Sequence, residues 1–526
     1  MDQEKLDNTR KNRVTVSHEE KTISIPVAAF SAISVTIGAG MVSVPKTAME
    51  AGIPFTIVYF TINLMLTIYS IHLLLESARV TGLYSMPRLA YKWFGPCSLY
   101  FVNFVQFIAF GVLPIAYFMI FAGITSNFFK EIPGIEESKW SFVTSNAFSV
   151  LLLGALVFPL IIKKQISELS IAGALLFTGV LLFNVLLIIM KFDKSSKIPY
   201  KPSDSHFFFR FEFNQALMSS LSTVFVAYGF QSGFFPIYNA LEKKNYKNGM
   251  KFASFSMGFA FVIYVWMMFS GLYTFGTSIQ GDVLDSLGDI SSWESFVLRS
   301  IFALIMLTHT PFVFFIGKES VLCLAVLIHL RFKNKQIEDE DWDEEPLLEN
   351  PDFDINQDLK RKRSKSERKS MRQSMSRKRI NDTVSRKNIE TSISLAIPFY
   401  KRSMKSIVVD EDDQQMSNAP AYTLLPNKIY YPVTIGLFVM VVGSAWVIKD
   451  VESVIKYIGS LGNSILNFLI PGVCYFIIMG RYEEEKTSAF KRYCALGLAI
   501  YGGTLAIICT GVNVWTTFHP LKNEYD

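Results

Sequence analysis

Apolar runs recur along the 526-residue chain, and each is long enough, at about 20 residues, to cross a hydrocarbon core about 30 Å thick. Half of the residues are hydrophobic and only 18% are charged, which excludes an ordinary soluble domain. The pattern predicts an all-α polytopic membrane protein. We predict eleven spans, at residues 24–49, 53–78, 98–128, 142–163, 169–192, 214–239, 250–275, 294–329, 428–449, 452–480 and 489–514.

Two of the predicted spans are interrupted at matching places. The first contains IGAGMVSVP at 37–45, and the sixth contains YGFQSGFFP at 228–236. In each stretch a glycine precedes a proline by seven residues, and a second glycine lies between them. Interruptions at corresponding places in two halves are typical of secondary transporters built from repeats. Because the breaks are five spans apart, an odd number, the halves must be inverted relative to each other.

A broken helix leaves backbone N–H and C=O groups without helical partners. Such a break inside a membrane must be buried in protein or line a watery cavity. Free N–H groups favour a carboxylate, and free carbonyls favour an ammonium group or a metal ion. A zwitterion suits both, and an amino acid is the simplest example. The candidate substrate-binding residues are Gly38, Ala39, Gly40, Met41, Tyr228, Gly229, Gln231, Ser232 and, on the third span, Tyr117.

Lysine and arginine near the span ends favour a cytosolic N-terminus, although the basic segment at 191–213 disagrees. Eleven spans then place the C-terminus in the lumen or outside the cell. The predicted organisation is a cytosolic tail at 1–23, spans one to eight at 24–330, a disordered charged cytosolic loop at 331–426, spans nine to eleven at 427–515, and a luminal or extracellular tail at 516–526.

The cytosolic loop contains DEEPLL at 343–348, which fits an acidic dileucine sorting pattern. Asp343, Leu347 and Leu348 are the residues that a sorting adaptor would bind. We therefore expect an endosomal, lysosomal or vacuolar membrane, with the plasma membrane as the alternative. The role of the rest of the loop stays open.

Other classes of protein find little support. The chain has no nucleic-acid fold signature, and no nucleophile–base arrangement or metal-ligand cluster indicates an enzyme or a cofactor. The five cysteines fall mostly within or beside apolar segments, so we expect buried small side chains and no disulfide framework.

Several stretches, in order, resemble the amino acid/auxin permease family of transmembrane amino acid transporters. The resemblance is carried by GAGMVSVP at 38–45, YSMPRLAYKWFGP at 84–96, FGVLPIAY at 110–117, FPLIIKKQISELS at 158–170, FVAYGFQSGFFPIYNAL at 225–241 and GSLGNSILNFLIPGVCY at 459–475. It implies a LeuT-type fold of two inverted five-helix repeats plus an eleventh helix, with substrate at the unwound middles of spans one and six.

The resemblance also bears on the coupling ion. Sodium-coupled relatives hold the ion with an asparagine before the first break and a threonine in span eight. Here the place of the asparagine falls on Ser34, and Ser31 lies one turn earlier. The place of the threonine falls on His309, which Thr308 and Thr310 flank. Hydroxyls and carbonyls can bind sodium, whereas a histidine indicates a proton. A neutral histidine that bonds a helix carbonyl is the third alternative.

Lys46 and Glu50 follow the first break one turn apart and can form an ion pair. We favour a pair at the rim over a lysine that faces the cavity. The leading function is transport of amino acids, neutral ones in the first place, by alternating access. The alternative is a transporter-like sensor that signals through its cytosolic loop with little flux.

Overall fold

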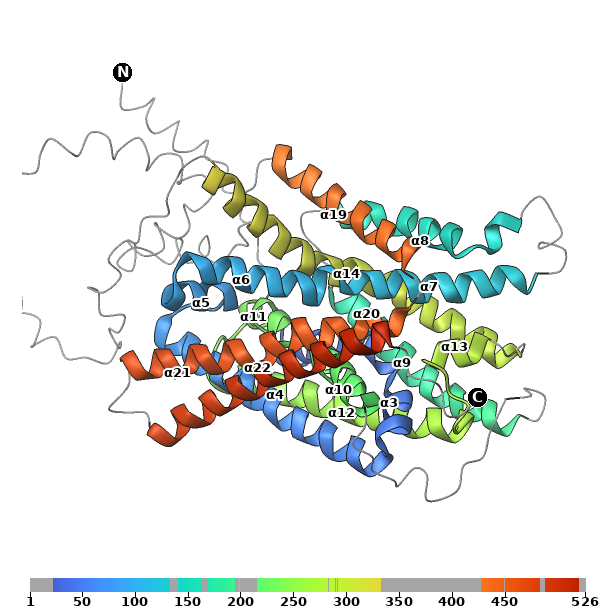
Figure 1. Ribbon diagram of the computed structural model, residues 1–526, viewed down its shortest axis with the longest axis horizontal. Helices are drawn as coiled ribbons and strands as arrows, with labels where there is room; N and C mark the ends of the chain where they lie inside the picture. The colour runs from blue at the N-terminus through green and yellow to red at the C-terminus, as the bar shows by residue number, and fades with distance from the viewer. Residues whose placement is uncertain are drawn as a thin grey trace, which may run out of the picture.

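The computed structural model describes residues 22–132, 141–162, 169–193, 198, 215–332 (without 282, 289 and 291), 427–482 (without 449) and 488–519. The predicted loop at 331–426, apart from its first two residues, lies outside this part, as do the dileucine residues and most of both tails. Within it the fold is helical, with one isolated β-bridge and no strand (Figure 1).

Helices occupy all eleven predicted ranges. The first span is α2 (Ile25–Thr36), the 3-10 turn η1 (Ala39–Met41) and α3 (Val44–Ala51); the sixth is α10 (Gln215–Ala227) and α11 (Gln231–Asn239). The unbroken spans are α4 (Ile53–Thr81), α8 (Asn146–Ile161), α9 (Leu169–Phe192), α12 (Tyr246–Phe275), α14 (Trp293–Phe332), α19 (Asn427–Val447) and α22 (Ala489–Phe518). Short helices α5 (Met86–Phe94) and α13 (Val283–Gly288) lie between spans.

Spans three and ten each contain a π-helical section. Span three runs through α6 (Pro96–Gln106), η2 (Phe107–Gly111) and α7 (Leu113–Lys130). Span ten runs through α20 (Val451–Tyr457), η9 (Ile458–Asn463), η10 (Ile465–Leu469) and α21 (Ile470–Tyr482). The wide turns η2 and η9 pack against each other, and Gly462 lies so close to Ala109 that a Cβ on the glycine would come within 3 Å of its backbone. Such sections occur most often at functional sites.

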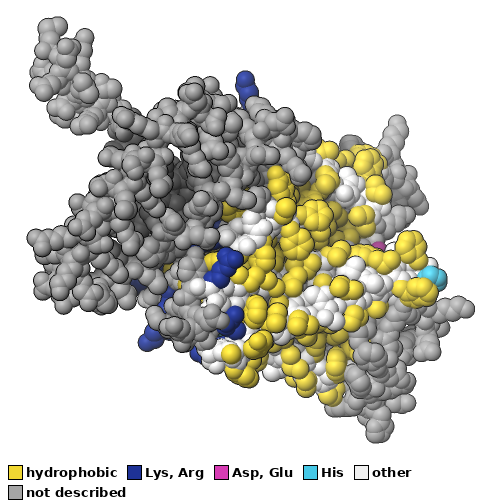
Figure 2. Space-filling view, turned by 60° about the vertical axis from the view of Figure 1, so that its left-hand side comes forward, with side chains coloured by type: hydrophobic (Ala, Val, Ile, Leu, Met, Phe, Trp, Pro, Cys, Tyr) yellow, Lys and Arg dark blue, Asp and Glu magenta, His cyan; other side chains and the backbone are white. Residues whose placement is uncertain are grey.

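In the described part of the chain, seven helices are long and apolar enough to cross a membrane. Spans one and six fall short of that length because their breaks divide them, and spans four and five contribute the shorter apolar helices Asn146–Ile161 and Leu176–Phe192. The outer surface fits a lipid environment: large side chains such as Val58, Phe255 and Ile507 are exposed. Figure 2 shows hydrophobic side chains over much of the described part of one face, with Lys and Arg gathered toward one end of it. The polytopic membrane class is confirmed.

The two broken spans run antiparallel to each other. The first half of span one, α2, packs against the second half of span six, α11, while α3 packs against α10. Gly40 lies against the backbone of Ala227, and Gly233 lies against Val35. This pairing is what inverted halves require, so the predicted inverted arrangement is confirmed. A short bridge also joins the chain ahead of α2 to the end of α11, where Ile23 N–H donates to the carbonyl of Ala240 (2.8 Å).

A buried lysine joins three helices that do not belong to the broken spans. Lys318 of α14 is 1% exposed and donates to the carbonyl of Ile161 on α8 (2.9 Å) and to the hydroxyl of Tyr430 on α19 (2.8 Å). A charge placed this deeply in an apolar interior must find such partners. Lys318 therefore fixes α8, α14 and α19 relative to one another.

The cysteine prediction is partly wrong. All five cysteines are free, and Cys474 and Cys509 are buried as expected. Cys97 and Cys494, however, are exposed, because each lies on an outward-facing side of its helix.

Candidate functional site

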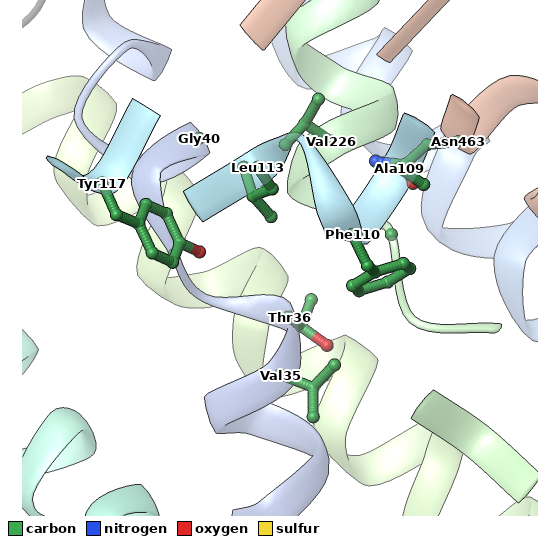
Figure 3. Close-up of a pocket in the computed structure, with 11 residues that line it drawn as sticks. Val35, Thr36, Gly40, Ala109, Phe110, Leu113, Tyr117, Val226 and Asn463 are labelled. Atoms are coloured by element: carbon green, nitrogen blue, oxygen red, sulfur yellow. The ribbon is translucent and has the colours of Figure 1, made fainter. Parts of the chain in front are cut away.

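A small cavity lies where the two breaks meet spans three and ten (Figure 3). Its volume is about 10 Å³, which is room for about one water molecule. The lining residues are Val35, Thr36, Gly38 and Gly40 from span one, Ala109, Phe110, Leu113 and Tyr117 from span three, Val226 and Gly229 from span six, and Asn463 from span ten. The glycine-broken segments thus form one wall, and the two π-helical spans form the other.

The structure brings four of the predicted substrate residues to this cavity: Gly38, Gly40, Gly229 and Tyr117. A Cβ on Gly38 would lie only 2.3 Å from the hydroxyl of Tyr117, so the missing side chain is what lets span three approach the break. The backbone of Ala39 lies between the two lining glycines of span one.

The other predicted substrate residues lie beside the cavity rather than on its wall. Met41, Tyr228 and Ser232 are buried among neighbouring helices. Gln231 caps the break in span six: its Oε1 accepts from the N–H of Phe230 (3.2 Å), and its Nε2 donates to the hydroxyl of Ser70 (3.5 Å). These bonds support a capping role for Gln231 rather than the expected contact with substrate.

The break in span one presents backbone N–H groups. Helix α2 ends where the N–H of Ile37 donates to Ile33, and the next hydrogen bond runs from Met41 to Gly38 (3.1 Å). Among the described residues, the N–H groups of Gly38, Ala39 and Gly40 have no hydrogen-bond acceptor. Three consecutive free donors at the start of a half-helix are suited to an anionic group such as a carboxylate.

The carbonyls freed by the breaks are held by side chains that the sequence did not single out. The hydroxyl of Tyr264, on α12, lies 3.0 Å from the carbonyl of Thr36 and 2.6 Å from that of Ala227, one from each broken helix. The Asn467 amide, on η10, donates to the carbonyls of Phe225 (3.3 Å) and Tyr228 (3.4 Å). No local pattern marks either residue, because their role depends on the contact between distant spans.

His309 lies beside the cavity, in contact with spans one and three. Its ring stacks on Tyr117 with centroids 5.3 Å apart, and its Cε1 would be 3.4 Å from a Cβ on Gly38. The side chain is 3% exposed, and neither ring nitrogen makes a hydrogen bond to any residue that the structure describes. The backbone of Ser34 nevertheless lies close enough to interact with the ring, so a histidine that bonds a helix carbonyl stays an alternative.

The four hydroxyl residues considered for ion coupling bond to their own helices. Ser31 and Ser34 donate to the carbonyls of Val27 and Ser31, both at 2.9 Å. On α14, Thr310 donates to Met306 (2.6 Å), and Thr308 donates to Leu304 and Ile305 (both 3.0 Å). Each oxygen still has acceptor capacity, so sodium ligation through these residues stays a prediction. No cluster of three or more His, Cys, Asp or Glu residues able to hold a metal occurs in the described ranges.

Lys46 and Glu50 form the predicted ion pair, with 3.7 Å between Nζ and Oε1. Neither residue lines the cavity. A second pair, Lys456 with Glu452 on α20, lies close enough to Glu50 to interact with it electrostatically. The charges beyond the first break thus form a cluster of four that links α3 to span ten.

Replacing Tyr264 with Phe should destabilise the protein by roughly 1–3 kcal/mol, because two buried carbonyls lose their donor. The measurement is the melting temperature of the purified protein in detergent. Tyr273→Phe, on the same helix but 51% exposed, is the control and should change nothing. Equal melting temperatures for the two variants would contradict this account of the breaks.

Comparisons with known proteins bear on the family to which the chain belongs. The chain shares 23% identity over 302 residues with a zebrafish (Danio rerio) protein provisionally named sodium-coupled neutral amino acid transporter 11, a match that covers 57% of this chain and 65% of the relative. The mouse (Mus musculus) protein of the same name is 24% identical, over 54% of this chain and 62% of its own. The chain therefore matches less than two thirds of the length of these relatives.

Two weaker similarities complete the comparison. A stretch of 92 residues, 16% of this chain and 22% of the relative, is 26% identical to vacuolar amino acid transporter 5 of Schizosaccharomyces pombe. A solved Na⁺-coupled sialic acid symporter aligns with 96% of this chain and 93% of its own at a TM-score of 0.45 and 12% identity. The assignment rests instead on the family match, which runs from residue 21 to residue 515: the chain belongs to the transmembrane amino acid transporter protein family.

Proposed function

We propose that this protein is a secondary active transporter that moves neutral amino acids by alternating access. The observation that carries the proposal is the cavity between the two breaks, which has free N–H groups at Gly38, Ala39 and Gly40 on one side. Those groups match an amino acid carboxylate, and the nearby carbonyl ends of α2 and α10 match its ammonium group.

The side chains around the cavity favour a neutral substrate. No charged side chain is among its lining residues in the part of the chain that the structure describes. Lys46, the charged residue closest in sequence to the break, is paired with Glu50 instead. Leaving a charged substrate side chain unpaired in this setting would cost several kcal/mol. The relatives named as neutral amino acid transporters are consistent with this choice.

The size of the cavity supports alternating access. Even the smallest amino acid is several times larger than one water molecule, so the cavity of about 10 Å³ must widen before substrate binds. The charge cluster joins α3 to α20 beyond the first break. If the cavity opens there, α3 and α20 must separate. The ion pairs Lys46–Glu50 and Lys456–Glu452 each lie within one helix, so both can persist during the movement.

The experiment is a liposome uptake screen of the twenty amino acids with the purified full chain, with sodium and proton gradients imposed separately. We expect concentrative uptake of one or more neutral amino acids that depends on one of the gradients. Binding without flux would favour the sensor alternative, which rests on the loop at 331–426. If the protein neither bound nor transported any amino acid, that result would contradict the proposal.

For the coupling ion, we propose a proton bound at His309. The imidazole is buried beside Tyr117 and Gly38 and lies within reach of the Ser34 backbone, so the binding of a proton or substrate at the break can change its contacts directly. A substrate carboxylate bound at the break would favour the protonated form of the imidazole. Proton and substrate would then bind together, which is the requirement for symport.

Replacing His309 with Ala should abolish the stimulation of uptake by an acidic donor side, because no group would then bind the proton beside the substrate. The measurement is initial uptake rate against pH. His72→Ala is the matched control, since His72 bonds to Tyr246 (2.7 Å) on another pair of helices and should keep the stimulation. An unchanged pH profile in the His309 variant would rule out this proton site and leave sodium as the candidate.

For location, we propose an endosomal, lysosomal or vacuolar membrane, with the N-terminus in the cytosol. The support is DEEPLL at 343–348 together with the similarity to a vacuolar transporter. Replacing Leu347 and Leu348 with Ala should move a fluorescently tagged protein to the plasma membrane, because the adaptor loses its apolar contacts. A double variant that stays on internal membranes would show that this motif does not sort the protein.

A further inference from the structure

Asn463 is the polar side chain that span ten contributes to the cavity lining. It closes the π-helical section η9, and Figure 3 shows it across the cavity from Tyr117. A Cβ on Gly229 would lie 2.7 Å from its Nδ2, so the amide reaches the break in span six because residue 229 has no side chain. Gly462 beside it brings η9 against span three in the same way.

The amide of Asn463 is buried but incompletely bonded. The residue is 3% exposed, and its Oδ1 has no hydrogen-bond partner among the residues that the structure describes. A buried amide oxygen without a donor is unfavourable, and in native proteins such an atom calls for a ligand, a water molecule or a functional role.

The need to hydrogen-bond the carbonyls freed at the break in span six does not explain Asn463, because the neighbouring Asn467 already bonds them. Asn467, about one turn further along span ten, donates to the carbonyls of Phe225 and Tyr228. The two asparagines therefore differ: the amide of Asn467 is occupied by the protein, whereas Asn463 faces the cavity with an acceptor to spare.

The two ends of the cavity also differ in chemistry. At the Gly38 end are the free backbone N–H groups, Tyr117 and His309, which suit a carboxylate. At the Gly229 end, Asn463 is surrounded by apolar lining from Ala109, Phe110 and Val226. A substrate held by its carboxylate at the first end would extend its side chain toward the second.

We propose that Asn463 is a specificity-determining residue, and that its amide hydrogen-bonds the side chain of neutral amino acids that carry an amide or a hydroxyl group. An amide offers one acceptor and two donors, so it complements these neutral polar groups, whereas an apolar side chain of the same shape leaves it unpaired. This inference rests on the proposed function and deepens it by naming the substrate class.

The test compares substrates of nearly equal shape in the reconstituted full chain: asparagine with leucine, and threonine with valine. Wild-type protein should prefer the polar member of each pair in kcat/KM by roughly ten- to hundred-fold, the discrimination expected of one hydrogen bond in a buried site. Asn463→Leu should bring both ratios close to one, mainly by raising KM for asparagine and threonine.

Two further variants keep the test decisive. Asn463→Asp retains the shape of the side chain and should favour substrates with a side-chain amino group, such as 2,4-diaminobutyrate. If Asn463→Leu does not fold, Asn463→Ser is used to measure the kcat/KM ratios of the polar to the apolar substrates. Asn513→Leu is the matched control, because Asn513 is equally buried (2% exposed) but bonds to Ser222 away from the cavity. It should leave both ratios unchanged even if the protein yield falls.

The outcomes separate this inference from the proposed function. Wild-type ratios near one, or ratios that Asn463→Leu and Asn463→Ser leave unchanged, would overturn the inference while amino acid transport stands. A wild-type protein that neither transports nor binds any amino acid, by uptake and by melting-temperature shift, would overturn the proposed function and this inference with it.

Discussion

The structure depends on how the backbone groups freed at two helix breaks are satisfied in an apolar interior. Lipid offers no hydrogen bonds, so each freed carbonyl and N–H must be bonded by protein, water or ligand. The Tyr264 hydroxyl lies within hydrogen-bond distance of one carbonyl from each broken span. It has a single proton to share between them, which couples the positions of the two breaks and explains why a tyrosine on a third span lies at their crossing.

The two kinds of freed backbone group are treated differently. Side chains of Tyr264 and Asn467 hold carbonyls of both breaks, whereas the N–H groups of Gly38, Ala39 and Gly40 have no acceptor among the described residues. An unpaired buried donor costs about 1–3 kcal/mol. In the proposed mechanism a substrate carboxylate would recover this cost, so the proposed site suits the anionic end of a zwitterion more than its cationic end.

The spans, the two breaks and their inverted pairing were predictable because each leaves a local pattern: apolar length, a glycine followed by a proline, and an odd number of spans between them. Three cavity residues, Gly38, Gly40 and Gly229, followed from the same pattern, and Tyr117 was a separate candidate on span three. Tyr264, Asn463 and Asn467 did not, because polar residues inside apolar runs look alike until the packing of distant helices shows which carbonyl each one meets. The π-helical sections of spans three and ten were equally invisible, since they arise from close packing around Gly462 rather than from intrinsic helix propensity.

The cavity lies between two groups of helices that are each joined internally by hydrogen bonds. Tyr264 and Asn467 connect the broken spans with α12 and span ten, while Lys318 connects α8, α14 and α19, and an ion pair between Arg299 and Glu131 connects α14 with α7. At the cavity itself the two groups meet through close packing, Gly38 against Tyr117 and Gly462 against Ala109. Close packing of this kind has less fixed geometry than the hydrogen bonds within each group, so the molecule is expected to open where the freed backbone groups of the breaks lie.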